Sequence, residues 1–353
     1  MSNVKKFLTR KDIVITPQRY LVEALGAMAQ GLFASLLIGT IIKTLGQQTC
    51  LEALVELGGY ASAMSGPAMA CAIGWALHTP PLVLFSLITV GYSANALGGA
   101  GGPLAVLIIA IVASELGKAV SKETKVDILV TPLVTIFTGV GLSMLIAAPI
   151  GAAASKVGTL IMWATEQAPL VMGIVVSVVV GVALTLPISS AAICAALGLT
   201  GLAGGAAVAG CCAQMVGFAV MSFKENGLGG LVSQGLGTSM LQMGNIVKNP
   251  RIWIAPTLAS AITGPLATCL FHLEMNGAAV SSGMGTCGLV GQIGVYTGWV
   301  NDVAAGVKAA ITPMDWIGLV LICFVLPAVL SVVFCEIERR MGWIKDGDLK
   351  LNG

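Results

Sequence analysis

A short polar segment at residues 271–276 interrupts the apolar second half of the sequence and carries His272, Glu274 and Asn276. A carboxylate accepts hydrogen bonds from hydroxyl groups, whereas imidazoles and amides both donate and accept them. In a continuous helix, His272 and Glu274 would point about 200° apart, but in an extended or broken segment both would line one side. Two interpretations stay open: a loop with solvated side chains, and the polar mouth of a hairpin that binds a solute.

Neutral polar side chains form further groups in the same half of the chain, in the sequences PISS (residues 187–190) and QMGN (residues 242–245) and at Gln292. Amides and hydroxyls supply directed donors and acceptors without leaving a buried charge, which suits a polyhydroxylated ligand. The alternative for each group is hydrogen bonding between neighbouring helices. Together with the polar segment, the candidate substrate-binding residues are Glu274, His272, Asn276, Ser189, Ser190, Asn245 and Gln292.

Residues for other kinds of chemistry are scarce. The nine cysteines show no CxxC pair and no Cys/His metal spacing, so we interpret them as buried thiols. The glycine-rich runs match no phosphate-binding pattern. We predict no metal, no cofactor and no self-contained catalytic site, which leaves the chain at most the membrane component of an enzyme. A net charge of +2 without a basic patch gives no indication of nucleic-acid binding.

The elements that position these residues follow from the distribution of charge. No charged residue occurs between Glu166 and Lys224, and only 10% of the chain is charged while 56% is hydrophobic. Soluble domains carry about 25% charged residues. A bilayer requires about 20 apolar residues for each helical crossing. The sequence therefore predicts an all-α polytopic membrane protein in contact with lipid, with a solute site near the bilayer midplane.

About ten transmembrane helices fit the apolar pattern. Several of these segments are short or rich in glycine, which favours broken helices or re-entrant hairpins in the C-terminal half. The dense glycine run at residues 98–103 predicts a turn or an unwound segment. The predicted crossings are residues 20–45, 54–77, 82–97, 104–116, 126–147, 170–186, 189–209, 253–271, 277–300 and 316–334.

Basic residues precede the first crossing, crowd the loop at residues 118–125 and follow the last crossing. Short basic loops stay in the cytoplasm, so we expect both termini on the cytoplasmic side. The predicted parts are a cytoplasmic basic N-terminus (1–19), an N-terminal helical bundle (20–148), an interfacial connector (149–168), a C-terminal substrate-binding bundle with hairpins (169–335) and a cytoplasmic tail (336–353).

Four stretches carry a family resemblance: TKVDILVTP (residues 124–132), LPISSAAI (186–193), GNIVKNPRIW (244–253) continuing to Gly264 and Pro265, and GMGTCGLVGQIG (283–294). They resemble the membrane-embedded sugar permease subunit, enzyme IIC, of the bacterial phosphotransferase system. More narrowly, they are similar to its stand-alone perfringolysin-regulator-like branch. The likeness spans residues 20–334. A location in the bacterial inner (cell) membrane follows from it.

The resemblance implies a homodimer whose N-terminal bundle forms the dimer contact and whose C-terminal bundle holds a sugar between re-entrant hairpins. It implies that Glu274 takes the role of the hairpin glutamate that hydrogen-bonds the sugar hydroxyl to be phosphorylated, and that His272 takes the role of a companion histidine. The usual glutamate motif of glucose-type permeases is not reproduced around Glu274. The sequence contains no IIA or IIB domain, so any phosphorylation requires a separate phosphocysteine IIB protein.

Two functions are compatible with these observations. The first is a permease for a sugar or similar small polar solute, and the alternative is a membrane sensor or regulator that binds the solute without transporting it. A sensor requires a cytoplasmic output module, whereas this sequence has short loops and a tail of about 18 residues. A membrane enzyme would need a nucleophile–base pair or a metal cluster. We therefore expect transport.

Overall fold

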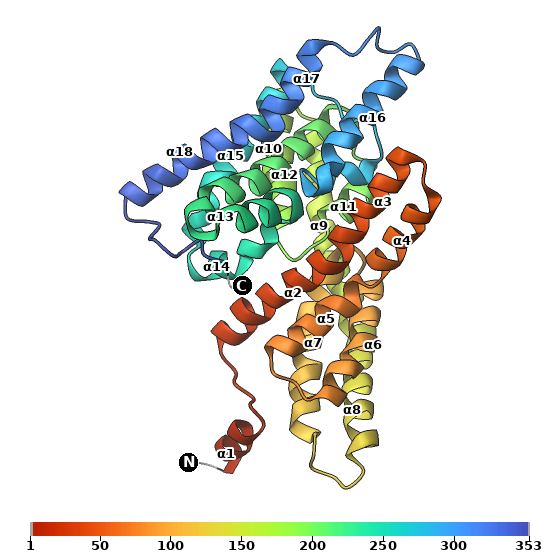
Figure 1. Ribbon diagram of the computed structural model, residues 1–353, viewed down its shortest axis with the longest axis vertical. Coiled ribbons are helices and arrows are strands. Elements are labelled where there is room, and N and C mark those ends of the chain that lie inside the picture. The colour runs from red at the N-terminus through yellow and green to blue at the C-terminus, as the bar shows by residue number, and fades with distance from the viewer. Residues whose placement is uncertain (1–2, 352–353) are drawn as a thin grey trace. The chain divides into compact units, whose positions relative to one another are not determined.

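The computed structural model describes residues 3–351 and is 82% helical, with no strands in the described part of the chain (Figure 1). The chain divides into two compact units, with the boundary between Ala154 and Ser155. We call them unit 1 and unit 2. The all-helical architecture predicted from the sequence is confirmed.

Unit 1 consists of helices (α) joined by short 3₁₀ or π-helical turns (η). Its elements are α1 (Asn3–Arg10), η1 (Gln18–Glu23), α2 (Ala24–Leu32), η2 (Phe33–Leu37), α3 (Ile38–Thr49), α4 (Glu52–Ala63), α5 (Ser65–Ala76), α6 (Pro81–Gly98), η3 (Gly99–Gly101), α7 (Gly102–Val120), α8 (Asp127–Leu142) and η4 (Ser143–Ala147). The following helix, α9 (Ala148–Thr165), crosses the boundary between the units.

A turn is present at the predicted glycine run. Gly99 has a φ of +51°, a conformation that glycine adopts without steric cost, and α6 and α7 pack against each other on either side of it. A Cβ atom on Gly102 would lie 2.5 Å from the side-chain oxygen of Asn95 on α6. Small residues thus allow the two helices of this hairpin to approach closely.

Unit 2 has shorter helices and more irregular backbone. Its elements after α9 are α10 (Pro169–Thr185), α11 (Ser190–Ala196), α12 (Gly201–Met221), α13 (Phe223–Val232), η5 (Ser233–Gly237), η6 (Ser239–Gln242), α14 (Met243–Lys248), η7 (Pro250–Trp253), α15 (Ile254–Pro265), η8 (Leu266–Leu270), η9 (Ala279–Gly283), η10 (Cys287–Leu289), α16 (Val290–Ala304), α17 (Pro313–Val320), η11 (Leu321–Val325) and α18 (Leu326–Arg340).

Helix α12 is the core of unit 2. It packs against α10, α15 and α18 (Figure 1), and 94% of its most apolar window is buried. Gly210 faces α10 so closely that a Cβ atom would overlap the carbonyl oxygen of Ser177. Because α12 is buried along its length, we describe the position of each polar group of unit 2 by the residue of α12 that it lies beside.

Two predicted crossings are broken. The helix expected over residues 189–209 ends with α11 and restarts at α12, with positive φ angles at Gly198 and Gly201. The helix expected over residues 277–300 begins with two short turns, η9 and η10, and becomes regular only in α16. Glycine supplies the conformations that these interruptions require, which the short, glycine-rich pattern had indicated.

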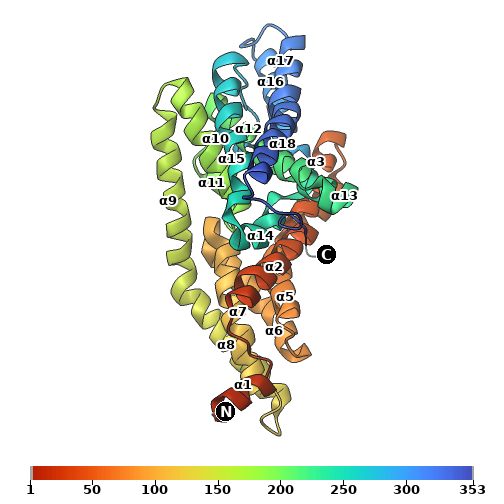
Figure 2. The ribbon, with the colours of Figure 1, turned by 90° about the vertical axis from the view of Figure 1, so that its left-hand side faces the viewer.

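Six helical runs are long and apolar enough to cross a membrane among the described residues: Gln18–Thr49, Pro81–Val120, Asp127–Thr165, Gly201–Met221, Pro250–Leu270 and Pro313–Arg340. The count of about ten crossings stays a prediction. The run Pro81–Val120 folds back at Gly99 and so contains two helices. Residues 149–168, predicted as an interfacial connector, largely continue α8 as one helical run over Asp127–Thr165 (Figure 2).

Candidate functional site

The polar segment predicted from the sequence is extended in the structure. After η8, Leu273 donates its backbone N–H to the carbonyl of Ala267 (2.8 Å), and Met275 forms an isolated antiparallel bridge with Gly201 at the start of α12. Leu273 and Met275 are buried, whereas His272 and Glu274 are exposed. The alternation over residues 273–275 is that of an extended chain, and both polar side chains, on Glu274 and on His272 just before the extended part, are exposed.

Glycines allow the extended segment to lie directly on the helices. A Cβ atom on Gly205 of α12 would overlap the carbonyl oxygen of Leu273, and one on Gly298 of α16 would lie 2.7 Å from the backbone nitrogen of Asn276. The segment therefore depends on two helix surfaces that have no side chain at the point of contact. Its position is fixed by packing, and this holds the exposed side chains in place.

Asn276 connects two carboxylates. Its side-chain nitrogen donates to Oε2 of Glu274 (3.1 Å) and to Oδ2 of Asp302 (2.8 Å), and its side-chain oxygen accepts from the backbone N–H of Gly201 (3.1 Å). All three polar functions of the amide are thus used within the protein. The second oxygen of each carboxylate makes no hydrogen bond with the described residues and is free to accept one from a ligand hydroxyl.

His272 lies beside this cluster without joining it. Its backbone φ is +46°, and its ring makes no hydrogen bond or ion pair with the residues that the structure describes. We refer to Glu274, Asn276 and Asp302 as the acidic cluster. Asp302 was not among the predicted site residues, because its partner Asn276 lies 26 residues away in the sequence and the contact depends on the fold.

The hydroxyl groups of Ser189 and Ser190 form hydrogen bonds with backbone groups. Ser189 caps α11 by accepting a hydrogen bond from the N–H of Ala192 (3.2 Å), and Ser190 donates to the carbonyl of Gly283 (2.7 Å). Ser282, next to Gly283, donates to the carbonyl of Leu199 (2.6 Å). These hydroxyls join the start of α11 to η9, so their observed role is to hold the two irregular segments together.

Gln292 lies deeper along α12. Its side-chain nitrogen donates to Sγ of Cys212 (3.1 Å), while its oxygen is buried and has no hydrogen-bond partner in the described part of the chain. Buried acceptors are nearly always paired, so one without a partner is a candidate contact for a ligand or a water. Cys212 is seven residues after Gly205, which corresponds to about 10 Å along the helix.

Asn245 lies at the other end of α12. Its side-chain nitrogen donates to Oε1 of Gln242 (2.8 Å) and to the carbonyl of Lys350 (2.9 Å). Gln242 in turn donates to Gln234 and to the carbonyl of Leu349, both at 2.9 Å. We call this set of buried amides the amide cluster and residues 343–351 the C-terminal segment. The helix is about 30 Å long, so Asn245 is not part of a single site with Glu274.

Gln214, near the middle of α12, was not predicted. Its side-chain oxygen accepts from the indole N–H of Trp253 (2.9 Å) and from the hydroxyl of Thr185 (3.3 Å), and its nitrogen donates to the hydroxyl of Thr257 (3.2 Å). The sequence feature that could have identified Gln214 is its position as a lone glutamine in an apolar run. These hydrogen bonds join α10, α12 and α15, so the observed role of Gln214 is to tie three helices together.

The expected position near the bilayer midplane stays a prediction, and the structure places the acidic cluster only relative to α12. The acidic cluster lies beside the first turn of α12 rather than near its middle, because the extended segment runs along residues 201–205. The side chains of Glu274 and His272 are exposed rather than enclosed. Within residues 3–351, no group of three or more His, Cys, Asp or Glu side chains is placed to hold a metal ion.

The fold and the polar groups within its apolar helices define a multi-pass α-helical membrane protein. The sequence model of the family described as phosphotransferase system, EIIC matches residues 22–351. The chain therefore belongs to the phosphotransferase system EIIC family and is a membrane permease component of that system, as the sequence resemblance indicated. No curated protein and no solved structure matches the chain.

Proposed function

We propose that this EIIC-family protein binds a sugar or a similar small polar solute through the acidic cluster and moves it across the membrane. A separate IIB protein supplies any phosphorylation. The observation that carries the proposal is the carboxylate of Glu274, of which Asn276 binds one oxygen and leaves the other free. The backbone segment that carries both residues is fixed against α12 and α16 at two glycines. Carboxylates in fixed positions are suited to the hydroxyl groups of a sugar.

Each of the neighbouring polar groups has a part in this proposal. Glu274 accepts a hydrogen bond from the solute hydroxyl, and in a phosphorylating cycle it holds that hydroxyl in line with the phosphocysteine donor. His272 contributes a second contact. Gln292 offers its unpaired oxygen to the solute farther along α12, and the Ser189–Ser190 turn supports the hairpin between these two points.

The remaining parts of the proposal concern assembly and orientation. The protein works as a homodimer through unit 1, with both termini in the cytoplasm. The basic residues before η1 and in the α7–α8 loop support this orientation, since short basic loops stay inside. A cytoplasmic IIB protein would then bind on the side of the membrane where the two termini lie.

The first prediction concerns Glu274→Gln. Glutamine keeps an acceptor for Asn276 but removes the charge, and a hydrogen bond to a charged group contributes about 1.5–3 kcal/mol, so solute affinity falls about 10- to 150-fold. A thermal-shift screen of the purified protein against sugars, polyols and their phosphates identifies the solute, because a bound ligand raises the melting temperature. Isothermal titration then gives the affinities of parent and variant.

The control is Glu336→Gln, which makes the same change at a half-exposed carboxylate on α18. It should leave solute affinity and melting temperature unchanged. Equal affinity in the parent and in Glu274→Gln would remove the acidic cluster from the site. In lipid vesicles, the parent protein should also carry the identified solute down its gradient without a phosphoryl donor. Binding without any uptake, with or without that donor, would identify the protein as a sensor instead.

A further inference from the structure

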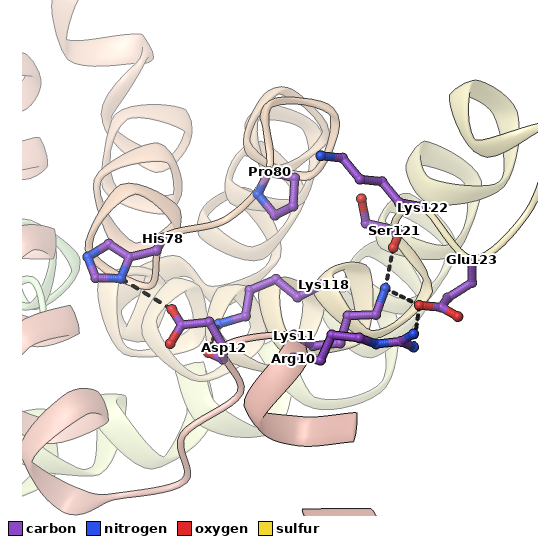
Figure 3. A pocket seen from close by; sticks show the side chains of 9 residues that line it. All are labelled: Arg10, Lys11, Asp12, His78, Pro80, Lys118, Ser121, Lys122 and Glu123. Atoms are coloured by element: carbon purple, nitrogen blue, oxygen red, sulfur yellow. Dashed lines mark hydrogen bonds and ion pairs between the residues drawn. The ribbon is translucent and has the colours of Figure 1, made fainter. Parts of the chain in front are cut away.

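A polar pocket of about 420 Å³ lies in unit 1, and none of its lining residues belongs to the proposed solute site. It is formed by the end of α1 and the residues after it, by the turn between α5 and α6, and by the end of α7 with the loop that follows (Figure 3). The lining residues are Arg10, Lys11, Asp12, His78, Pro80, Lys118, Ser121, Lys122 and Glu123.

The charges around this pocket do not cancel. The lining contains four cations and two carboxylates, which leaves a formal charge of +2. Of the charged groups bonded to the lining, Arg19, which binds Asp12 (2.6 Å), and Glu115, which binds Lys118 (3.0 Å), cancel each other. Asp127, which accepts the backbone N–H of Lys122 (2.6 Å), adds one negative charge, so an excess of +1 is left. The hydrogen bond from Arg19 lowers the pKa of Asp12 to about 2, so this carboxylate is already counted as ionised at neutral pH.

Most of the cations are held by internal partners. Arg10 pairs with Glu123 (2.7 Å), Lys11 pairs with the same carboxylate, and the buried Lys118 donates to the carbonyls of Asp12 (2.7 Å) and Leu77 (3.0 Å). These pairs fix the walls of the pocket. They also supply positive potential without requiring long side chains to become ordered when a ligand binds.

Lys122 differs from the other three cations. Its ammonium group makes no hydrogen bond or ion pair with any residue in the described part of the chain, and Figure 3 shows its side chain extending past Ser121 toward Pro80. Its backbone is fixed, because its N–H donates to Asp127 Oδ1 (2.6 Å) and its φ is +60°. The loop therefore presents one free cation at the rim of a pocket that is already positive.

The pocket lies where apolar surface begins. Directly after the α7–α8 loop, Val126, Ile128 and Leu129 are 55%, 72% and 62% exposed, and Ile15 on the N-terminal side of the pocket is 74% exposed. The run Asp127–Thr165 that starts here is one of the helices apolar enough to cross a membrane. A charged pocket next to such a surface is at the depth of lipid headgroups.

We propose that this pocket binds the phosphate of an anionic phospholipid headgroup, with the acyl chains lying along the exposed apolar side chains at the start of α8. The phosphate accepts hydrogen bonds from Lys122 and from the outward-facing nitrogens of Arg10, which is 61% exposed. The acyl chains distinguish this ligand from a free phosphate, which would use the same cations but gain nothing from Ile128 and Leu129.

The test uses full-length protein purified in detergent, with bound lipid measured by native mass spectrometry and by thermal shift. Phosphatidylglycerol should bind and raise the melting temperature, whereas phosphatidylcholine, inorganic phosphate and glycerol phosphate should not. Lys122→Gln should weaken phosphatidylglycerol binding about fivefold. The matched control is Lys125→Gln, because Lys125 is an exposed lysine of the same loop that does not line the pocket.

Three results would overturn the proposal. Equal losses in Lys122→Gln and Lys125→Gln would mean that only the general charge of the loop attracts the lipid. Equal binding of phosphatidylcholine would remove the role of net charge. Binding of inorganic phosphate as tight as that of phosphatidylglycerol would assign the pocket to a soluble anion instead. Solute affinity of Lys122→Gln should match the parent, so this test is independent of the Glu274 site.

Discussion

The two ends of α12 carry polar clusters that differ in what they leave unpaired. At its start, Asn276 holds one oxygen of Glu274 and one of Asp302, and the other oxygens are open to the surroundings. At its end, the amide nitrogens of Gln242 and Asn245 donate within the amide cluster and to backbone carbonyls of the C-terminal segment. Both clusters consist of side chains that suit a sugar. Spare hydrogen-bonding capacity, rather than residue type, separates a candidate binding site from a structural contact.

This comparison predicts two kinds of mutational effect. Changes at the start of α12 should alter solute affinity, whereas changes at its end should alter stability. A change that moves the extended segment itself should alter both. The three variants below test these statements in order of decreasing expected effect.

Gly205→Ala should have the largest effect. Its new Cβ atom would overlap the carbonyl oxygen of Leu273, and overpacking of this kind costs about 1–3 kcal/mol or more. Because the displaced backbone carries Glu274, solute affinity should fall together with the melting temperature. The control is Gly229→Ala on α13, where an added Cβ meets nothing within 4 Å. Unchanged stability and affinity in Gly205→Ala would show that the extended segment does not depend on this contact.

Asn245→Ala should lower the stability of unit 2 without changing solute affinity. The substitution leaves Gln242 Oε1 and the carbonyl of Lys350 without their donor. Gln242 is fully buried, whereas Lys350 is exposed, so the cost comes mainly from Gln242 Oε1, at about 1–3 kcal/mol for an unpaired buried group. Thermal unfolding and solute titration on the same sample separate the two effects. Gln48→Ala, which removes an exposed amide from α3, is the control. A loss of affinity at full stability would instead place Asn245 in the solute site.

Asp12→Asn should have the smallest effect, visible only in the pH dependence of stability. In the folded protein the pKa of Asp12 is about 2, below its ordinary value of 3.8, so its stabilising contribution is present above pH 3.8 and is lost as the pH falls toward 2. The side chain is 48% exposed, so solvent screening keeps the contribution below about 1 kcal/mol.

The measurement for Asp12→Asn is the melting temperature of parent and variant between pH 5 and pH 2.5. The parent should lose more stability than the variant over this interval, because only the parent loses the Asp12–Arg19 pair. Asp346→Asn makes the same change on a fully exposed side chain and serves as the control. Parallel curves for parent and Asp12→Asn would mean that the pair contributes nothing measurable.

The sequence predicted those features of the structure that depend on the composition of a single segment. Absence of charge predicted membrane helices, and clustered glycines predicted the turn at Gly99 and the breaks before α12 and α16. The extended conformation at residues 273–275 was one of two alternatives, because a short polar segment has no periodicity that distinguishes them. Helix continuity over Asp127–Thr165 was missed, since Lys156 and Glu166 among small residues resembled an interfacial segment.

Partnerships between distant residues could not be predicted. Asn245 and Gln292 have the same kind of side chain in a similar apolar context. The amide nitrogen of Asn245 donates to two acceptors, one of them 105 residues away, whereas Gln292 has a buried oxygen without a partner among the described residues. Asp302 and Gln214 joined their clusters through contacts that sequence position does not reveal. Hydrogen-bond saturation is a property of the packed structure, so the sequence identifies candidate polar groups but not which of them remain free.

The hydrogen bonding between the amide cluster and the C-terminal segment has a consequence for biosynthesis. A ribosome adds Lys350 at a point 105 residues after Asn245. During that interval the amide nitrogens of Asn245 and Gln242, which later donate to the carbonyls of Lys350 and Leu349, must be hydrated or must bond to other groups. Unit 2 thus completes its internal hydrogen bonding only when translation has passed Leu351. Nascent chains that stall earlier keep polar groups exposed beside an apolar helix, and are less stable than chains that continue.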